Sequence, residues 1–108
     1  MSKIVLNYEN KEYELEYSRQ SVKMMEGQGF VLDEITAKPM TMIPLLFTGA
    51  FIKNCKGTKR ATIDEIYKNI ANKTALLEAL MEMYSETLSS LTDDSGEEEG
   101  NVTWTLTK

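Results

Sequence analysis

Histidine is absent from this chain of 108 residues, and Cys55 is its only cysteine. No disulfide bond can therefore form within the chain, and no zinc site can be built from histidine and cysteine. Without histidine, a cysteine or serine nucleophile also lacks its usual base near neutral pH. We expect Cys55 to be a reduced, small apolar side chain, and we expect no catalytic residue, no cofactor and no bound metal ion.

The chain also lacks a hydrophobic run long enough for a membrane and a surplus of positive charge. Its most apolar stretch, residues 40–52, spans about 20 Å as a helix, whereas a bilayer core requires roughly 30 Å. Residues 1–5 contain no long apolar leader, so we expect a cytoplasmic protein. Residues 1–91 carry 11 basic and 12 acidic side chains and offer no overall basic surface for nucleic acid.

The acidity is concentrated at the C-terminal end of the chain. Of the formal net charge of −5, residues 92–108 contribute five acidic side chains and a single basic one. The length and the 42% hydrophobic content are typical of one domain with a modest core. We expect residues 1–91 to form a single α+β domain, residues 92–100 an acidic tether, and residues 101–108 a C-terminal strand.

Two N-terminal segments alternate apolar and polar residues, which is the pattern of strands with one buried face. The apolar positions are Ile4, Leu6 and Tyr8 in the first segment and Tyr13, Leu15 and Tyr17 in the second. The polar residues 9–11 between them predict a β-hairpin whose second strand is acidic on its outer face. Because a two-stranded ribbon is marginal in water, it needs a helix beneath it or a third strand beside it.

The C-terminal residues have the pattern of such a third strand. Val102, Trp104 and Leu106 alternate with threonines, and Trp104 is the only tryptophan of the chain. Successive side chains of a strand point to opposite faces of the sheet, so these three residues would share one apolar face. The strand is predicted to dock either on the hairpin of its own domain or on a partner.

Helical spacing begins after the hairpin. Ser18 or Ser21 is a suitable N-cap for a first helix, and Gly27 or Gly29 ends it because glycine accepts the left-handed conformation of a helix terminus. A second helix is predicted within residues 39–55, where apolar residues occupy almost every face. This pattern indicates a buried core helix, or one with an apolar face left over for a partner.

Two further helices are predicted in the C-terminal half, which makes about four in total. Thr62 followed by Glu65 has the spacing of a capping box and predicts the start of the third helix. The fourth helix is predicted over residues 75–91, with a leucine-rich stripe that faces the core. The hairpin is therefore expected to pack on a bundle of helices.

Four basic side chains occur close together in residues 53–60. One interpretation is a contact for an anion or a nucleic acid. A second is a solvated helix end, because the helix macrodipole favours cations at the C-terminus. A third is that the segment attracts the acidic tether of the same chain. Seven methionines are also many for this length, and flexible thioether side chains suit surfaces that adapt to apolar partner helices.

The order of these motifs resembles that of a family of small bacteriophage and prophage proteins. The resemblance covers nearly the whole chain, and residues 38–51 are its most specific part. The segments that carry it are residues 15–17, 22–26, 29–30, 38–51, 63–67, 82–86 and 99–104. The family is similar to the tail assembly chaperones of siphophages, the phages with long, non-contractile tails.

This resemblance implies a non-enzymatic function in virion morphogenesis. Such a chaperone binds the long, helical tape-measure protein and helps to recruit tail-tube subunits, so both proteins are expected partners, and a homo-oligomer is possible. Helix-in-groove binding is the expected mode. The candidate partner-binding residues are Met40, Met42, Leu45, Phe47, Phe51, Met81, Tyr84 and Trp104.

Two other functions remain open at the level of sequence. The chain would suit a structural protein of the virion, such as a tail or head-completion protein that oligomerises through the C-terminal strand. It would less readily suit a small regulatory protein that binds nucleic acid through residues 53–60. A membrane association is not expected.

Overall fold

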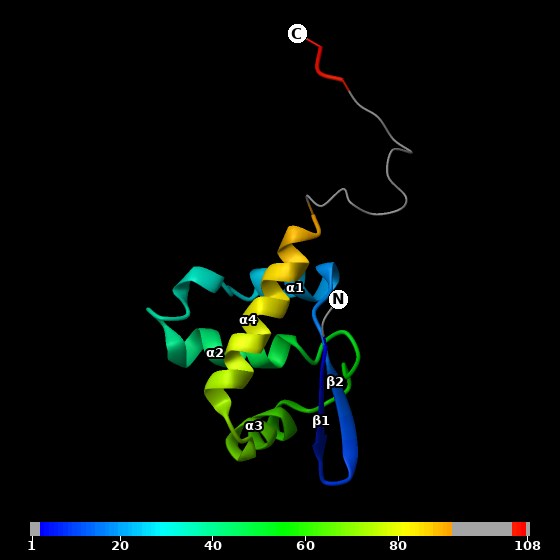
Figure 1. Cartoon of the computed structure of the whole chain (residues 1–108), viewed down its shortest axis with the longest axis vertical. Helices are drawn as coiled ribbons and strands as arrows, with labels where there is room; N and C mark the ends of the chain where they lie inside the picture. The colour runs from blue at the N-terminus through cyan, green and yellow to red at the C-terminus, as the bar shows by residue number, and fades with distance from the viewer. Residues whose placement is uncertain (1–2, 92–104, 108) are drawn as a thin grey trace.

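The computed structural model describes residues 3–91 and 105–107, and within them the fold is α+β, as predicted from the sequence (Figure 1). An N-terminal antiparallel hairpin lies beside four α-helices. The elements are β1 (Ile4–Tyr8), β2 (Lys11–Leu15), α1 (Arg19–Gly27), the short 3₁₀ helix η1 (Leu32–Glu34), α2 (Pro39–Gly49), α3 (Arg60–Asn69) and α4 (Lys73–Ser89). Helix α4 runs diagonally across the helical part, and the hairpin forms one side of the molecule (Figure 1).

A two-residue turn connects the two strands of the hairpin. Tyr8 is opposite Lys11, so only Glu9 and Asn10 remain in the turn. Both have positive φ, 51° and 65°, which is the backbone of a type I′ turn. Lys11, predicted as a turn residue, is therefore the first residue of β2.

The inner face of β2 and the two residues that follow supply much of the core. Tyr13, Leu15 and Tyr17 are buried, as the alternation predicted, and the glutamates between them face outward. The ring of Tyr13 meets the ring of Phe51 edge-on, with centroids 5.9 Å apart. The helical part of the molecule thus provides the cover that a two-stranded ribbon needs.

Helix α1 begins and ends where its local sequence predicts. The Ser18 hydroxyl accepts a hydrogen bond from the Ser21 N–H at 3.1 Å, and the Ser21 hydroxyl accepts one from the Ser18 N–H at 2.8 Å. This reciprocal pair satisfies two backbone donors at the helix start. After Gly27 the chain turns away through Gly29, whose φ of +96° is a conformation that only glycine adopts without strain.

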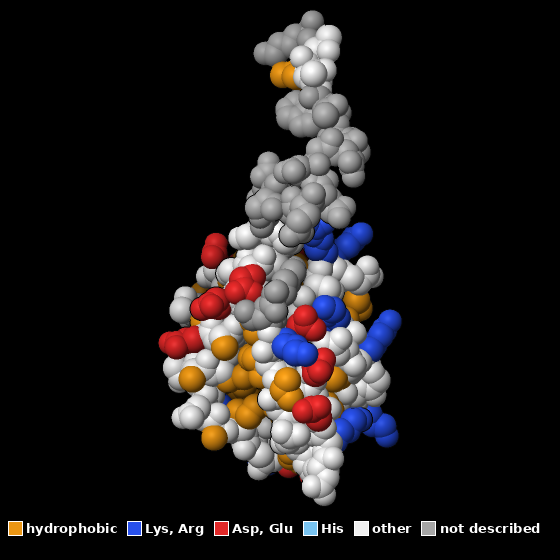
Figure 2. Space-filling model, turned by 45° about the vertical axis from the view of Figure 1, so that its right-hand side comes forward, with side chains coloured by type: hydrophobic (Ala, Val, Ile, Leu, Met, Phe, Trp, Pro, Cys, Tyr) orange, Lys and Arg blue, Asp and Glu red, His pale blue; other side chains and the backbone are white. Residues whose placement is uncertain are grey.

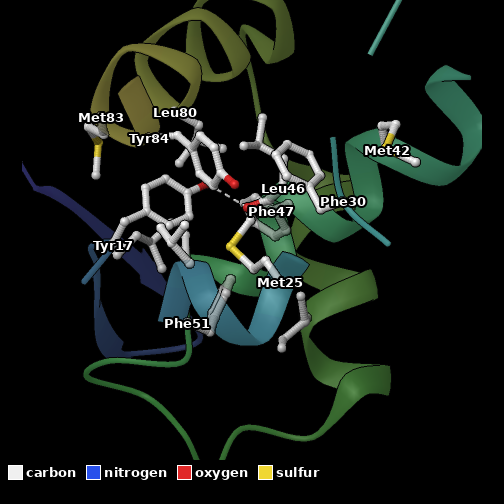
Figure 3. Close-up of a cluster of buried hydrophobic side chains, with 14 of the residues drawn as sticks. Tyr17, Met25, Phe30, Met42, Leu46, Phe47, Phe51, Leu80, Met83 and Tyr84 are labelled. Carbon is white, nitrogen blue, oxygen red and sulfur yellow. Dashed lines mark hydrogen bonds between the residues drawn. The ribbon is translucent and has the colours of Figure 1, made fainter. Parts of the chain in front are cut away.

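The C-terminal end of α2 is attached to β2 and forms the centre of the core (Figure 3). The Tyr17 hydroxyl donates to the Leu46 carbonyl at 2.6 Å, and the Glu16 N–H donates to the Ala50 carbonyl at 3.0 Å. The α-helix includes Pro44 and gives way to tighter turns after Gly49. These bonds join the sheet to the helices through the main chain of α2.

The predicted capping box at Thr62 is wrong. Helix α3 already begins at Arg60, with Lys59 as its N-cap, so Thr62 lies within the first turn. Arg60 and Asp64 form an ion pair at 3.5 Å across one helical turn, which becomes possible only with the earlier start. Helix α4 also begins slightly earlier than predicted, after Asn72 in the left-handed conformation with φ of 55°.

Most of the predicted C-terminal strand, residues 101–104 and 108, lies outside the described residues. Residues 105–107 are described; they are exposed and have no regular secondary structure. Among the helices of the described residues, none combines the length and the apolar character required to cross a membrane.

Candidate functional site

The eight predicted partner-binding residues separate into three groups in the structure. Met40 has 90% of its surface exposed, and Leu45 and Met81 are half-buried. The buried residues are Met42, Phe47, Phe51 and Tyr84. Trp104 lies outside the described residues. The structure therefore does not bring the set together as one exposed surface.

The buried residues of this set hold the core together (Figure 3). The Phe47 and Phe51 rings pack edge-on with centroids 5.2 Å apart, and Tyr84 packs in the same way against Tyr17 at 5.5 Å. The Met42 sulfur accepts the Val31 N–H at 3.4 Å. Their role in the folded chain is packing, although Phe47 and Tyr84 also form the floors of two surface hollows.

The first hollow lies between α2 and α3 and has a volume of about 200 Å³. We call it the α2–α3 pocket; its lining residues are Ile43, Pro44, Phe47, Thr48, Asp64 and Tyr67. The Phe47 and Tyr67 rings meet edge-on with centroids 5.1 Å apart. Because a dry cavity of about 150 Å³ can hold a benzene ring, the pocket has room for one large apolar side chain.

Met40 extends the apolar lining of this pocket along the surface of α2. Residues three, four and seven positions apart share one face of a helix, so Met40 precedes Ile43, Pro44 and Phe47 on the same face. Figure 2 shows that hydrophobic side chains also gather in the middle of one face of the helical body, with charged side chains around them. Thr48 and the carboxylate of Asp64, which is paired with Arg60, add polar groups to this mainly apolar pocket.

The second hollow is larger, about 450 Å³, and lies between the end of α1, η1 and α4. Its apolar residues are Phe30, Val31, Leu32, Tyr84 and Leu88, and its acidic residues are Glu26 and Asp33. The pKa of Tyr84 is raised, first by burial and then by the nearby Glu26 carboxylate. The hydroxyl therefore stays protonated in this acidic hollow.

Some of the basic side chains of residues 53–60 form ion pairs within the fold. Lys53 pairs with Glu16 at 3.1 Å, and the Asn54 side chain donates to the same carboxylate at 2.9 Å. Hydrogen bonds from Asn54 and then from Lys53 lower the pKa of Glu16. Arg60 is paired with Asp64, so two of the four cations have carboxylate partners among the described residues. These pairs favour a structural role for the segment.

Cys55 is half-buried, and its Sγ lies 3.6 Å from the Glu14 carbonyl. Within the ranges that the structure describes, no group of three or more histidine, cysteine, aspartate or glutamate residues is placed to hold a metal ion. The two hollows described above are lined mainly by apolar side chains.

Sequence reasoning missed the part of the pocket that α3 supplies. Asp64 and Tyr67 both lie on α3 and line the pocket, and neither belongs to the partner-binding set predicted from the sequence. The four-residue spacing between Arg60 and Asp64 could have indicated the earlier start of α3, because an ion pair with this spacing places both residues within one helix.

Comparisons with known proteins identify a family for this chain. No curated protein and no solved structure matches it. A family model described as "Domain of unknown function (DUF5055)" matches residues 1–107. Since this match covers almost the whole chain, the protein belongs to the DUF5055 family.

Proposed function

We propose that this protein is a non-enzymatic tail assembly chaperone of a phage with a long, non-contractile tail. In this function it binds the tape-measure protein in the host cytoplasm and helps to recruit tail-tube subunits. The resemblance described above suggests the class. The observation that carries the proposal is the α2–α3 pocket with Met40 exposed beside it.

This surface suits an amphipathic helix. One large apolar side chain of the helix enters the α2–α3 pocket, and its neighbours pack against Met40, whose flexible thioether adapts to different partners. A tape-measure protein presents many such helical segments, and binding them does not require a catalytic group.

The contribution of Met40 can be estimated from its exposure. Burying a methionine side chain that is fully exposed stabilises a complex by about 1.5–3 kcal/mol. Since 1.4 kcal/mol corresponds to about a tenfold change in affinity, Met40→Ser should weaken binding by roughly 10- to 100-fold. The substitution leaves the core unchanged, because the side chain is 90% exposed.

Co-expression with the tape-measure protein of the same phage tests the proposal. The expected result is a complex on size-exclusion chromatography and an increase in soluble tape-measure protein. Met40→Ser should reduce both. Met24→Ser is the matched control, because Met24 is 39% exposed on α1 and does not line the α2–α3 pocket. If no complex forms with the unaltered chain, the proposal fails.

A structural protein of the virion is the second candidate. The outer edge of β1 favours it, because no strand of the described residues pairs with this edge and an unpaired edge is a site for strand pairing between chains. Mass spectrometry of purified virions distinguishes the two functions. A chaperone is absent from finished particles, whereas a tail or head-completion protein is present in a fixed copy number.

A further inference from the structure

The two strands of the hairpin differ in how their outer edges are used. Tyr8 and Lys11 flank a two-residue turn and exchange hydrogen bonds, and such pairs then alternate along the ladder. The N–H and C=O groups of Val5 and Asn7 therefore point away from β2. On β2 the outward-pointing groups belong to the glutamates, including Glu14.

The segment that follows α2 occupies the outer edge of β2. The Asn54 side-chain amide donates to the Glu14 carbonyl at 3.4 Å. The Glu16 N–H, just beyond the end of the strand, donates to the Ala50 carbonyl at 3.0 Å. Another strand therefore cannot pair along the whole of β2 without displacing this segment.

The outer edge of β1 has no such cover among the described residues. None of the hydrogen bonds found within residues 3–91 and 105–107 reaches the backbone of Val5 or Asn7. Natural sheets protect an open edge with charged side chains, proline or a bulge, but β1 contains no charged residue and no proline and pairs with β2 without a bulge. Its inward-facing residues, Ile4, Leu6 and Tyr8, are only half-buried. The edge thus offers main-chain hydrogen-bonding groups together with apolar side chains.

We propose that the β1 strands of two copies of this chain pair edge to edge, antiparallel, across a two-fold axis at Leu6. In this register Val5 of one copy is opposite Asn7 of the other, and the two residues exchange both main-chain hydrogen bonds. Ile4 is opposite Tyr8 of the second copy, so all five residues of β1 are paired. The contact is isologous, because the same residues of both copies form it. This inference does not depend on the proposed function.

The alternation along β1 selects this register. Outward-pointing groups can pair only with outward-pointing groups, so the axis lies at Val5, Leu6 or Asn7. An axis at Val5 or at Asn7 leaves two of the five residues of β1 opposite residues outside the strand. With the axis at Leu6 the whole strand is paired, and the inward-facing side chains of both copies form one continuous apolar face.

Charge complementarity supports the same register. Beyond the ends of the paired strands, Lys3 of one copy is opposite Glu9 of the other, and both side chains are exposed. Glu9 belongs to none of the ion pairs found among the described residues, and Lys3 has only an exposed pair with Glu14 at 3.4 Å. In the two shifted registers Lys3 faces Asn7, or Glu9 faces Val5, so opposite charges do not meet there. The axis at Leu6 therefore gives an ion pair at each end of the contact.

The occupied edge of β2 limits this assembly to two copies. When the β1 strands are paired, the resulting four-stranded sheet ends on both sides at β2, where the segment after α2 covers the edge. An isologous contact closes on itself, whereas a free edge would allow further strands to add. The structure thus favours a dimer over a fibre.

Two complementary charge variants test the register. Sedimentation velocity of the unaltered chain should show a monomer–dimer equilibrium between about 10 μM and 1 mM, as expected for a small interface. Lys3→Glu and Glu9→Lys should each raise the dissociation constant at least about tenfold at low salt, because like charges then face each other at both ends. An equimolar mixture of the two variants should restore the dimer, because every facing pair is again opposite in charge. Lys23→Glu, the same charge change on α1, is the control and should have little effect.

Hydrogen exchange of individual amides by NMR locates the contact. The Val5 and Asn7 amides should gain protection as the concentration of the unaltered chain increases. The Leu6 and Tyr8 amides already bond to β2 in the monomer, so they should change little. Asn7→Pro removes an outward-pointing N–H, which an edge strand tolerates because this group does not bond to its neighbour. This variant should remain folded by circular dichroism but lose the dimer.

The other possible results would overturn the proposal. A monomer at every concentration, or a dimer that the edge variants leave unchanged, excludes pairing at this edge. Protection of the Val5 and Asn7 amides that does not depend on concentration would assign the edge to a segment of the same chain. If both charge variants lose the dimer and their mixture does not recover it, the register with its axis at Leu6 is wrong.

Discussion

The buried hydroxyl of Tyr17 offers the sharpest test of how the sheet is attached to the helices. In a regular helix the Leu46 carbonyl would accept the Ala50 N–H. Here the Ala50 N–H bonds to the Phe47 carbonyl instead, at 3.1 Å, because α2 tightens at its end. The Tyr17 hydroxyl takes the vacant place on Leu46 at 2.6 Å.

Tyr17→Phe removes this donor and leaves the Leu46 carbonyl buried without a partner. Such a group costs about 1–3 kcal/mol of the free energy of unfolding. The edge-on contact of the ring with Tyr84 at 5.5 Å remains, so no large cavity contributes. For a domain of this size, each kcal/mol lowers the melting temperature by roughly 4–8 °C.

Urea denaturation at pH 7, followed by circular dichroism, measures this loss. Tyr67→Phe is the matched control, because Tyr67 is only half-buried and its ring contact with Phe47 is retained. The control should lose less than about 0.5 kcal/mol. If Tyr17→Phe costs no more than the control, the hydroxyl does not stabilise the attachment of α2 to the strand.

Three further outcomes follow from the same structure. Gly49→Ala should destabilise the chain by about 1–3 kcal/mol in thermal or urea unfolding, because the new methyl group would collide with the fully buried side chain of Met25. Gly27→Ala, where nothing lies within 4 Å of the new methyl group, should be neutral or stabilising. Hydrogen bonds from Asn54 and then from Lys53 lower the pKa of Glu16 in the folded chain. The contribution of Glu16 to the free energy of unfolding is therefore present above the unfolded-state pKa of about 4.3 and is lost as the pH falls through the folded-state pKa. Glu16→Gln should therefore cost up to about 1 kcal/mol at neutral pH and approach the unaltered chain in acid, and a constant difference across the acid range would contradict this. Burial raises the pKa of Tyr17, so the contribution of its neutral hydroxyl to the free energy of unfolding is full below about pH 10 and is lost as the pH rises above that. The free energy of unfolding should therefore fall less steeply at alkaline pH in Tyr17→Phe than in the unaltered chain. Parallel curves for the two chains would argue against burial as the cause.

The elements that the sequence predicted well are those with local signals. The hairpin follows from strict alternation, and α1 follows from Ser18 and Gly29, whose capping bond and positive φ are properties of a few neighbouring residues. The predicted start of α3 was wrong because the capping-box pattern at Thr62 competes with the ion pair between Arg60 and Asp64. Both arrangements satisfy local rules, and only the packing of the helix distinguishes them.

The candidate site was less predictable because α2 is apolar on nearly every face. Met40 and Met42 have the same side chain and lie two residues apart, yet one is 90% exposed and the other is buried. A hydrophobic periodicity without a polar face cannot identify the buried side. That choice depends on where β2, α3 and α4 lie, and this is tertiary information.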